Sequence, residues 1–302
     1  MVLQAVKCIL VLFFVLGLSV CDNDKDNKKF PPGFLIGAAT ASYQIEGGHD
    51  ADGKGESIWD RFVRQRPSPI KDGSTGDIAA DSYNKYKEDV DILKNVGFDH
   101  YRFSISWPRI MPNGEISEVN QKGIDYYNRL INELLENKIE PVVTMFHWDL
   151  PQTLQDLGGW SNPAIVEYFE DYAYILYKSF GDRVKYWITI NEGLIMVVGY
   201  NLPIIAPGLY INGSGEYLAG HNIIKAHAKA YRLYEREFKP KQKGKVGVST
   251  VGEFIMPADK SDESKQAADR ALQFSIGWFA NPIFGKDGDY PKIMRDVIDQ
   301  NS

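Results

Sequence analysis

The chain repeats a unit in which apolar residues at helical spacing are followed by a short strand-like segment. Between residues 162 and 192 the pattern is clearest, because apolar residues recur every three or four positions: Ile165, Phe169, Tyr172, Leu176 and Phe180. This spacing predicts a helix, with Asn162 as cap, Pro163 at its first position and Gly181 at its end. From Val184 to Ile190 every second residue is apolar, which predicts a strand.

The same helix-then-strand unit occurs three more times. The predicted helices run from Tyr83 to near Gly97, from Ile124 to Leu134 and from Tyr217 to Phe238, and the strands that follow them are Tyr101 to Ser106, Val142 to Thr144 and Lys245 to Val251. An opening strand from Phe34 to Thr40 brings the number to five. Strands separated by helices at this spacing indicate a parallel α/β sheet.

Between the two common parallel α/β architectures, the sequence favours a single-domain (β/α)8 TIM barrel. It has no Gly-x-Gly-x-x-Gly after a strand and no phosphate-loop lysine motif, which weakens the doubly wound nucleotide-binding alternative. After Val251 the pattern predicts a polar loop from Lys260 to Lys265, a helix from Ala267 to Ile276 and a helical stretch from Lys292 to Val297. A barrel needs eight strands, so we expect an incomplete one, present through about the fifth strand.

Composition narrows the class of protein. The 302 residues are 44% hydrophobic, which suits a globular domain, and the net charge is −6 without a basic stripe, so nucleic acid is an unexpected partner. Seventeen Tyr and six Trp offer flat faces on which sugar rings can stack, although most aromatic residues fill cores. Neutral small molecules fit this balance better than polyanions.

The first 21 residues have the pattern of a signal peptide. Lys7 precedes an apolar run from Cys8 to Leu18, and a charged stretch begins after Cys21. The run is too short to span a bilayer, so we expect secretion and no membrane anchor. Cleavage near Cys21 would leave the mature chain without cysteine. Asn212 begins an Asn-Gly-Ser sequon for N-glycosylation, which agrees with secretion.

Polar residues gather where the predicted strands end. Gln44 follows the first strand, Arg102 lies in the second, His147 follows the third, and Asn191 and Glu192 follow the fourth. In parallel barrels this end carries the chemistry. Amide, imidazole and guanidinium groups bind hydroxyl groups directionally, and a carboxyl can protonate a glycosidic oxygen. Each residue alone is usually structural; their recurrence in successive units indicates a site. No second His or Cys lies at metal-ligand spacing from His147, so we expect neither a metal nor a cofactor.

Several longer motifs resemble those of glycoside hydrolase family 1, in that family's order, from Phe30 to residue 302. They are Phe34 to Gly47 (FLIGAATASYQIEG), Tyr101 to Arg109 (YRFSISWPR), Phe146 to Gln152 (FHWDLPQ), Trp187 to Glu192 (WITINE), Gly277 to Pro282 (GWFANP) and Gly288 to Pro291 (GDYP). The resemblance implies a retaining O-glycosyl hydrolase of small β-glucosides, with residues 30–302 as the N-terminal part of its barrel. It gives no prediction of oligomeric state.

The resemblance also implies roles for individual residues. Glu192 takes the general acid/base position and Asn191 the position that bonds the sugar 2-hydroxyl. Gln44, His147 and Trp148 would contact the other hydroxyls, and Arg102 would steady the carboxylate of the nucleophile. Retaining hydrolysis needs that second carboxylate ~5 Å from the acid.

The sequence departs from the family pattern in two places. Gly193 stands where the family usually has proline, which we expect to loosen the loop that carries Glu192. The family's nucleophile lies in a Glu-Asn-Gly motif on the seventh strand, and this chain has none; Glu136-Asn137-Lys138 is the nearest approach, at the end of a predicted amphipathic helix. We therefore expect the nucleophile to be missing and this chain to be inactive.

Two alternatives remain open. One is a non-catalytic sugar-binding or interaction protein on the same scaffold, although intact Gln44, His147, Asn191 and Glu192 argue against it. The other is a thioglucosidase of the myrosinase type. Plant members of that type replace the acid/base glutamate with glutamine, so Glu192 favours an O-glycosidase.

Overall fold

The computed structural model describes residues 30–211 and 213–301, and the chain divides into two units, residues 1–35 and 36–302. In the first unit the rings of Phe30 and Phe34 stack with centroids 4.5 Å apart. The predicted signal peptide and the sequon residue Asn212 lie outside the described residues. The site and the fold discussed below belong to the second unit.

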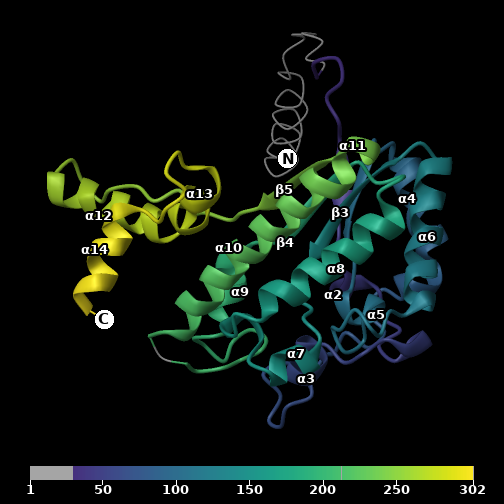
Figure 1. Cartoon of the computed structure of the whole chain (residues 1–302), viewed down its shortest axis with the longest axis horizontal. Helices are drawn as coiled ribbons and strands as arrows, with labels where there is room; N and C mark the ends of the chain where they lie inside the picture. The colour runs from purple at the N-terminus through teal and green to yellow at the C-terminus, as the bar shows by residue number, and fades with distance from the viewer. Residues whose placement is uncertain (1–29, 212, 302) are drawn as a thin grey trace, which may run out of the picture. The chain divides into compact units, whose positions relative to one another are not determined.

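A five-stranded parallel sheet forms the centre of the second unit, as the sequence predicts (Figure 1). Its strands are β1 (Gly37–Ala39), β2 (His100–Ser104), β3 (Glu140–Phe146), β4 (Tyr186–Asn191) and β5 (Lys245–Ser249). They pair in the order in which they occur along the chain. A doubly wound sheet reverses its strand order at a switch point, whereas a TIM barrel does not. The observed order is therefore that of a partial (β/α)8 barrel.

Long helices connect these strands and cover the sheet. The connecting helices are α4 (Ser82–Val96), α6 (Gln121–Glu136), α8 (Ile165–Phe180) and α10 (Gly215–Leu233). Helix α4 packs against α6, and α8 packs against α10, so neighbouring crossovers lie on the same side of the sheet (Figure 1). The π-helical segment η3 (Tyr234–Phe238) and α11 (Lys239–Gln242) continue α10.

Shorter helices follow the strands, and three more helices follow β5. Among the described residues these are α2 (Ser42–Ile45), α3 (Ile58–Val63), α5 (Trp107–Ile110), α7 (Gln152–Asp156), α9 (Gly193–Val198), α12 (Asp262–Phe274), α13 (Ile276–Phe284) and α14 (Lys292–Asn301), with the 3₁₀ segments η1 (Ala51–Gly53) and η2 (Gly159–Ser161). None of the helices in residues 30–211 and 213–301 has the length and apolar character needed to cross a bilayer.

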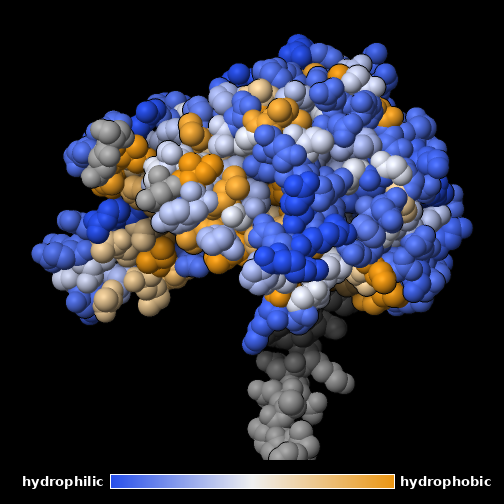
Figure 2. All heavy atoms as spheres, turned by 90° about the horizontal axis from the view of Figure 1, so that it is seen from below, coloured by the Kyte–Doolittle hydropathy of each residue, from blue (hydrophilic) through white to orange (hydrophobic). Residues whose placement is uncertain are grey.

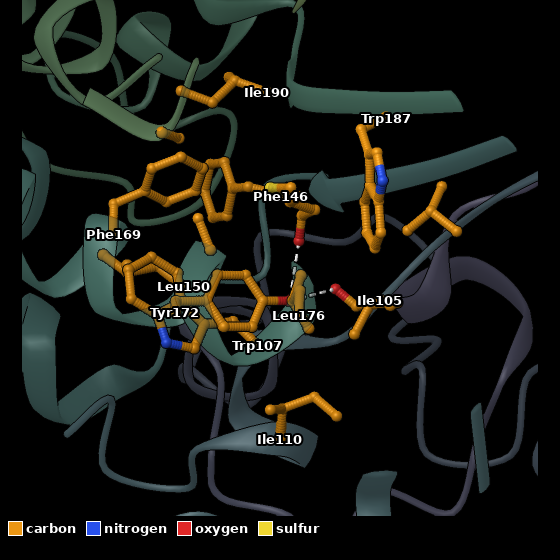
Figure 3. Close-up of a cluster of buried hydrophobic side chains, with 14 of the residues drawn as sticks. Ile105, Trp107, Ile110, Phe146, Leu150, Phe169, Tyr172, Leu176, Trp187 and Ile190 are labelled. Atoms are coloured by element: carbon orange, nitrogen blue, oxygen red, sulfur yellow. Dashed lines mark hydrogen bonds between the residues drawn. The ribbon is translucent and has the colours of Figure 1, made fainter. Parts of the chain in front are cut away.

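The core lies between the strands and the helices that follow them (Figure 3). Trp107 of α5 stacks on Tyr172 of α8 with ring centroids 4.6 Å apart. The Tyr172 hydroxyl lies 2.9 Å from the carbonyl oxygen of Met145 and 3.1 Å from that of Ile105. These contacts satisfy the buried phenol and tie helix α8 to the ends of two neighbouring strands.

Several predicted boundaries are wrong. Helix α8 begins at Ile165 with Ala164 as its N-cap, not at Pro163 after an Asn162 cap, and β2 and β5 each end two residues earlier than predicted. The opening strand is shorter than Phe34 to Thr40, because only three of its residues pair with β2. The predicted polar loop from Lys260 to Lys265 contains the start of α12, because the Ser261 side chain caps that helix by accepting a hydrogen bond from the Ser264 amide (3.2 Å). The predicted helix from Ala267 to Ile276 is broken at Ser275, whose φ of −101° and ψ of −95° separate α12 from α13.

Candidate active site

The predicted site residues all lie in or just after the strands, toward one edge of the sheet. Gln44 is in α2, directly after β1, and Arg102 is in the middle of β2. His147 and Trp148 follow the last residue of β3, and Asn191 is the last residue of β4, with Glu192 after it. Because parallel strands end at the same edge, the sheet brings residues that are far apart in sequence to one place.

Asn191 is the centre of a hydrogen-bond network. Its side-chain oxygen accepts from Nη2 of Arg102 (2.5 Å), its Nδ2 lies 3.2 Å from Nε2 of His147, and its carbonyl oxygen accepts from the indole N–H of Trp148 (2.8 Å). Arg102 also donates through Nε to the hydroxyl of Thr144 (2.9 Å). The network fixes the side chains at the ends of β2, β3 and β4 relative to one another.

His147 is neutral near pH 7. Burial lowers the pKa of His147 to about 4, and the nearby charge of Arg102 acts in the same direction. The Nδ2 group of Asn191 can only donate, so Nε2 of His147 accepts this hydrogen bond. The proton of the neutral ring is therefore on Nδ1. Nδ1 is buried and has no hydrogen-bond partner within the described residues. It is a donor enclosed by the protein and left unsatisfied there.

Glu192 lies beside this network. Burial lowers the pKa of Arg102, while the charge of the nearby Glu192 carboxylate opposes that shift. The Glu192 side chain is half-buried, and its backbone N–H donates to the Ser249 carbonyl of β5 (2.8 Å). The carboxylate is thus close to a guanidinium and held between the ends of β4 and β5.

A cavity of about 390 Å³ opens next to the network, and Gln44, His147 and Trp148 form part of its wall. The wall also includes Tyr43 and Trp59, whose rings stack with centroids 5.7 Å apart. Arg102, Asn191 and Glu192 are not part of this wall. Asn191 connects to it through its hydrogen bonds to His147 and Trp148, and Arg102 connects to it only through Asn191.

Two residues of the site have a backbone conformation that side chains rarely adopt. Trp148 has a φ of 72° and Glu192 a φ of 46°, both in the left-handed region. Such a conformation costs free energy for a bulky residue and persists where surrounding contacts impose it. Both residues directly follow a strand end, so the strain lies where the two side chains turn out of the sheet.

Comparison with known proteins agrees with this geometry. The model of the family described as "Glycosyl hydrolase family 1" matches residues 26–302. This chain belongs to glycosyl hydrolase family 1.

The relatives of this family 1 chain include enzymes from animals and bacteria. It is 56% identical over 275 residues to Myrosinase 1 of Brevicoryne brassicae, covering 91% of this chain and 59% of that protein. It is 49% identical to the cytosolic beta-glucosidase of Homo sapiens, covering 89% of this chain and 58% of that protein. The chain thus spans about three fifths of the length of these curated relatives.

Solved structures give the same picture. The structure of aphid myrosinase matches with a TM-score of 0.88 at 56% identity, covering 91% of this chain and 59% of that one. The family 1 β-glucosidase of Thermotoga maritima matches with a TM-score of 0.84 at 46% identity, covering 89% and 59%. The five-stranded sheet is therefore the matching portion of a family 1 barrel.

Gly193, where the family usually has proline, is buried and begins helix α9. A Cβ atom at this position would lie 2.6 Å from Cε1 of Phe279 and 3.0 Å from Cγ2 of Ile223. The expected loosening of the loop that carries Glu192 stays a prediction. The absence of a side chain lets helix α13 pack closely against the start of α9.

The sequence reasoning missed several residues of this family 1 site. Thr144 holds Arg102, Tyr43 and Trp59 line the cavity, and Asp149 accepts a hydrogen bond from Ser42 (2.6 Å) beneath it. Thr144 and Trp59 lie outside the motifs quoted above. The other residues lie inside them, but the motifs alone do not show where their side chains point. Only the fold shows which of them face the cavity.

Two other histidines, both in helix α10, form hydrogen bonds within the fold. Nδ1 of His227 is 2.8 Å from the Thr189 hydroxyl, and Nδ1 of His221 is 2.7 Å from the Tyr290 hydroxyl. Residues 30–211 and 213–301 contain no group of three His, Cys, Asp or Glu side chains placed to hold a metal ion.

Proposed function

We propose that this chain is part of a retaining β-glycosidase that hydrolyses small β-glucosides, with Glu192 as its general acid/base. The observation that carries the proposal is the network centred on Asn191. It joins His147 and Trp148, which line the cavity, to Arg102, and Arg102 lies close to the charge of Glu192. Family membership supports the same reaction class.

Recognition of the sugar follows from the free polar groups. His147 and Gln44 line the same cavity, and the amide of Gln44 offers both a donor and an acceptor to a sugar hydroxyl. The indole N–H of Trp148 is already used by the Asn191 carbonyl. Trp148 therefore contacts the sugar through its ring, not through a hydrogen bond.

The chemistry requires a proton donor and a nucleophile on opposite sides of the glycosidic bond. Glu192 gives its proton to the leaving oxygen while a second carboxylate attacks the anomeric carbon, and water then releases the sugar with Glu192 acting as base. This chain contains no Glu-Asn-Gly motif to supply the second carboxylate. We propose that hydrolysis belongs to a form that includes the rest of the relatives' length, where Arg102 steadies that carboxylate.

We also propose that the protein is secreted. The apolar run from Cys8 to Leu18 and the sequon at Asn212 support entry into the secretory pathway. Expression in insect cells with detection of the protein in the medium, and its mass before and after glycosidase treatment, tests both features. A protein retained inside the cells without glycan would contradict them.

The first experiment is to sequence the transcript beyond the codon for Ser302. If it encodes three more strands and a Glu-Asn-Gly motif, the extended chain should hydrolyse an aryl β-glucoside. Glu192→Gln should then lower kcat at least 100-fold for a poor leaving group, with added azide restoring turnover for an activated one. Glu263→Gln, at an exposed position of α12, is the matched control and should be silent.

The 302-residue chain alone should show no turnover of the same substrate. Measurable hydrolysis by this chain, abolished by Glu192→Gln, would contradict the need for a second carboxylate from outside it. Binding of deoxynojirimycin without turnover by the extended chain would instead favour the sugar-binding alternative; a β-glucosidase of Thermotoga maritima has been solved with that compound.

A thioglucosidase is the second candidate, because the 56% identity to Myrosinase 1 exceeds the identity to the β-glucosidases named above. Glu192 supplies an acid that an O-glycoside needs more than a thioglycoside does, since a thiolate leaves without protonation. Comparing kcat/KM of the extended chain on a glucosinolate and on an aryl β-glucoside decides between them.

A further inference from the structure

A second, much smaller cavity lies next to the cavity that Gln44, His147 and Trp148 line. Its volume is about 10 Å³, which is the space that one water molecule needs. Polar and charged side chains from helices α2, α3 and α5, and from the loop after β3, make up most of its lining: Ser42, Glu46, Lys54, Ser57, Asp60, Ser106, Arg109 and Asp149.

Three side-chain oxygens of this lining have no hydrogen-bond partner within the described residues. They are Oδ1 of Asp60, Oγ of Ser106 and Oδ1 of Asp149. Their residues are 2%, 2% and 1% exposed, so bulk solvent does not satisfy them. Buried polar groups are nearly always hydrogen-bonded, and three exceptions lining one cavity point to a common partner.

The other carboxylate oxygens of the same residues are fully used. Oδ2 of Asp60 accepts from Nζ of Lys54 and from the hydroxyl and amide of Ser57, each at 2.8 Å. Oδ2 of Asp149 accepts from the Ser42 hydroxyl (2.6 Å). Each carboxylate therefore has one oxygen held by protein groups and one without a hydrogen-bond partner among the described residues.

The charges around the cavity favour a neutral occupant. Lys54 and Arg109 already line it together with the acidic residues, and Nη1 of Arg64 lies 3.7 Å from Oδ1 of Asp60. A cation would add positive charge beside these groups and would need more oxygen ligands than three. Water has two hydrogens for two carboxylate oxygens and a lone pair for one hydroxyl, which matches the unpartnered set.

We propose that one buried water molecule occupies this cavity, donates to Oδ1 of Asp60 and Oδ1 of Asp149, and accepts from the Ser106 hydroxyl. It joins α3, the start of α5 and the loop after β3 next to the larger cavity, with which the small cavity shares Tyr43 and Gly76. Asp149 follows Trp148, and Ser42, to which Asp149 is bonded, lies two residues before Gln44. On the proposed function, the water thus helps to hold Gln44 opposite His147 and Trp148.

A crystal structure of the chain at a resolution that shows ordered water tests the site directly. Burial raises the pKa of Asp149 to about 7, so crystals at pH 8 contain the carboxylate. The expected result is one density peak at ~2.6–3.1 Å from all three oxygens. The inference is wrong if the peak is absent, if the carboxylates turn to pair with protein groups, or if crystals soaked in thallium(I) show an anomalous peak there.

Ser106→Ala supplies the variant test, because it removes the one donor to the water and leaves both carboxylates. The peak should disappear or lose most of its occupancy, while Ser106→Thr should keep it; Ser117→Ala, at an exposed loop, is the control. A peak unchanged in Ser106→Ala would contradict the assigned acceptor contact.

The effect of the water on the position of Gln44 is measured in the extended, active form. Ser106→Ala should raise KM for an aryl β-glucoside about threefold or more with little change in kcat, and Ser106→Thr should restore it. An unchanged KM would overturn the positioning role. Absence of turnover in the parent enzyme would count against the proposed function and not against the water, which the crystal structure tests independently.

Discussion

At the scale of single residues, Gly193 illustrates how a departure from a family pattern is explained by a neighbour. A proline at the first position of a helix is usually favourable, because it lacks an N–H that would be unpaired there. Here the ring of Phe279 occupies the space that a side chain at residue 193 would need. The two residues are therefore expected to be coupled, although 86 positions separate them in the sequence.

Restoring the proline should destabilise this chain. We expect Gly193→Pro to lower the free energy of unfolding by about 1–3 kcal/mol, the usual cost of overpacking, and Phe279→Ala to reduce that cost when both changes are combined. Chemical denaturation measures both effects in a double-mutant cycle. Gly247→Ala is the control, because a Cβ at Gly247 meets no atom within 4 Å; a stabilising Gly193→Pro in the parent background would disprove the coupling.

The residues that the sequence predicts for the site differ in how far the pattern alone could place them. Gln44, His147 and Asn191 follow predicted strands, and parallel strands end at one edge, so their proximity follows from the fold class. The sequence pattern does not show which ring nitrogen of His147 lacks a hydrogen-bond partner, because this depends on the contact with Asn191. The roles of these residues in sugar binding stay predictions.

At the scale of secondary-structure elements, a buried ion pair between Glu46 and Arg109 joins helices α2, α4, α5 and α6. Glu46, directly after α2, accepts from Nε of Arg109 in α5 (2.9 Å) and from the hydroxyl of Tyr127 in α6. The guanidinium of Arg109 also lies 4.1 Å from the centre of the Tyr83 ring in α4. These contacts hold the helix of Gln44 against the helices that cover β2 and β3.

Removing one charge of this pair should be costly. Glu46→Gln leaves the Arg109 charge buried without its partner, and we expect the free energy of unfolding to fall by about 3–5 kcal/mol. The pair of Glu235 and Lys239 on the protein surface is the matched control. Glu235→Gln should change the free energy of unfolding by less than about 0.5 kcal/mol. Thermal and chemical unfolding measure both; equal effects of the two substitutions would contradict the argument.

Periodicity predicted the long connecting elements well and the segment after β5 poorly. Helices α4, α6, α8 and α10 each bury one side against the sheet, so their apolar residues recur at helical spacing. Helix α12 has a single buried residue, Ala268, and so carries little of that signal. Its start depends instead on the Ser261 cap, a local hydrogen bond that hydrophobic spacing does not report.

At the scale of the whole second unit, the sheet has two edges, β1 and β5, among the described residues. The segment after β5 exposes large apolar side chains, with Phe254 at 85% and Met256 at 70%. Figure 2 shows hydrophobic patches among mostly hydrophilic residues on the face that it views. A barrel closed by further strands would cover β5, which is consistent with the longer relatives.

The pH dependence of stability of the described chain depends on three buried groups that act in opposite directions. Burial lowers the pKa of His147 and of His227 to about 4, and it raises the pKa of Asp149 to about 7. Between about pH 4.5 and 6 the unfolded chain binds a proton on each histidine that the folded chain does not, while the folded chain keeps one on Asp149. The three groups together make stability rise with pH by about 1.4 kcal/mol per unit, the value for one net proton.

Single substitutions should change this slope in opposite directions. His227→Gln removes a group that binds a proton in the unfolded chain but not in the folded chain. The slope between pH 4.5 and 6 should therefore fall by about 1.4 kcal/mol per unit. Asp149→Asn removes a proton that the folded chain keeps, so the slope in the same range should rise by about 1.4 kcal/mol per unit. Denaturation at several pH values measures these differences, in which all other ionisable groups cancel. An unchanged slope for Asp149→Asn would mean that Asp149 is ionised throughout this range, held so by the cations that line the small cavity.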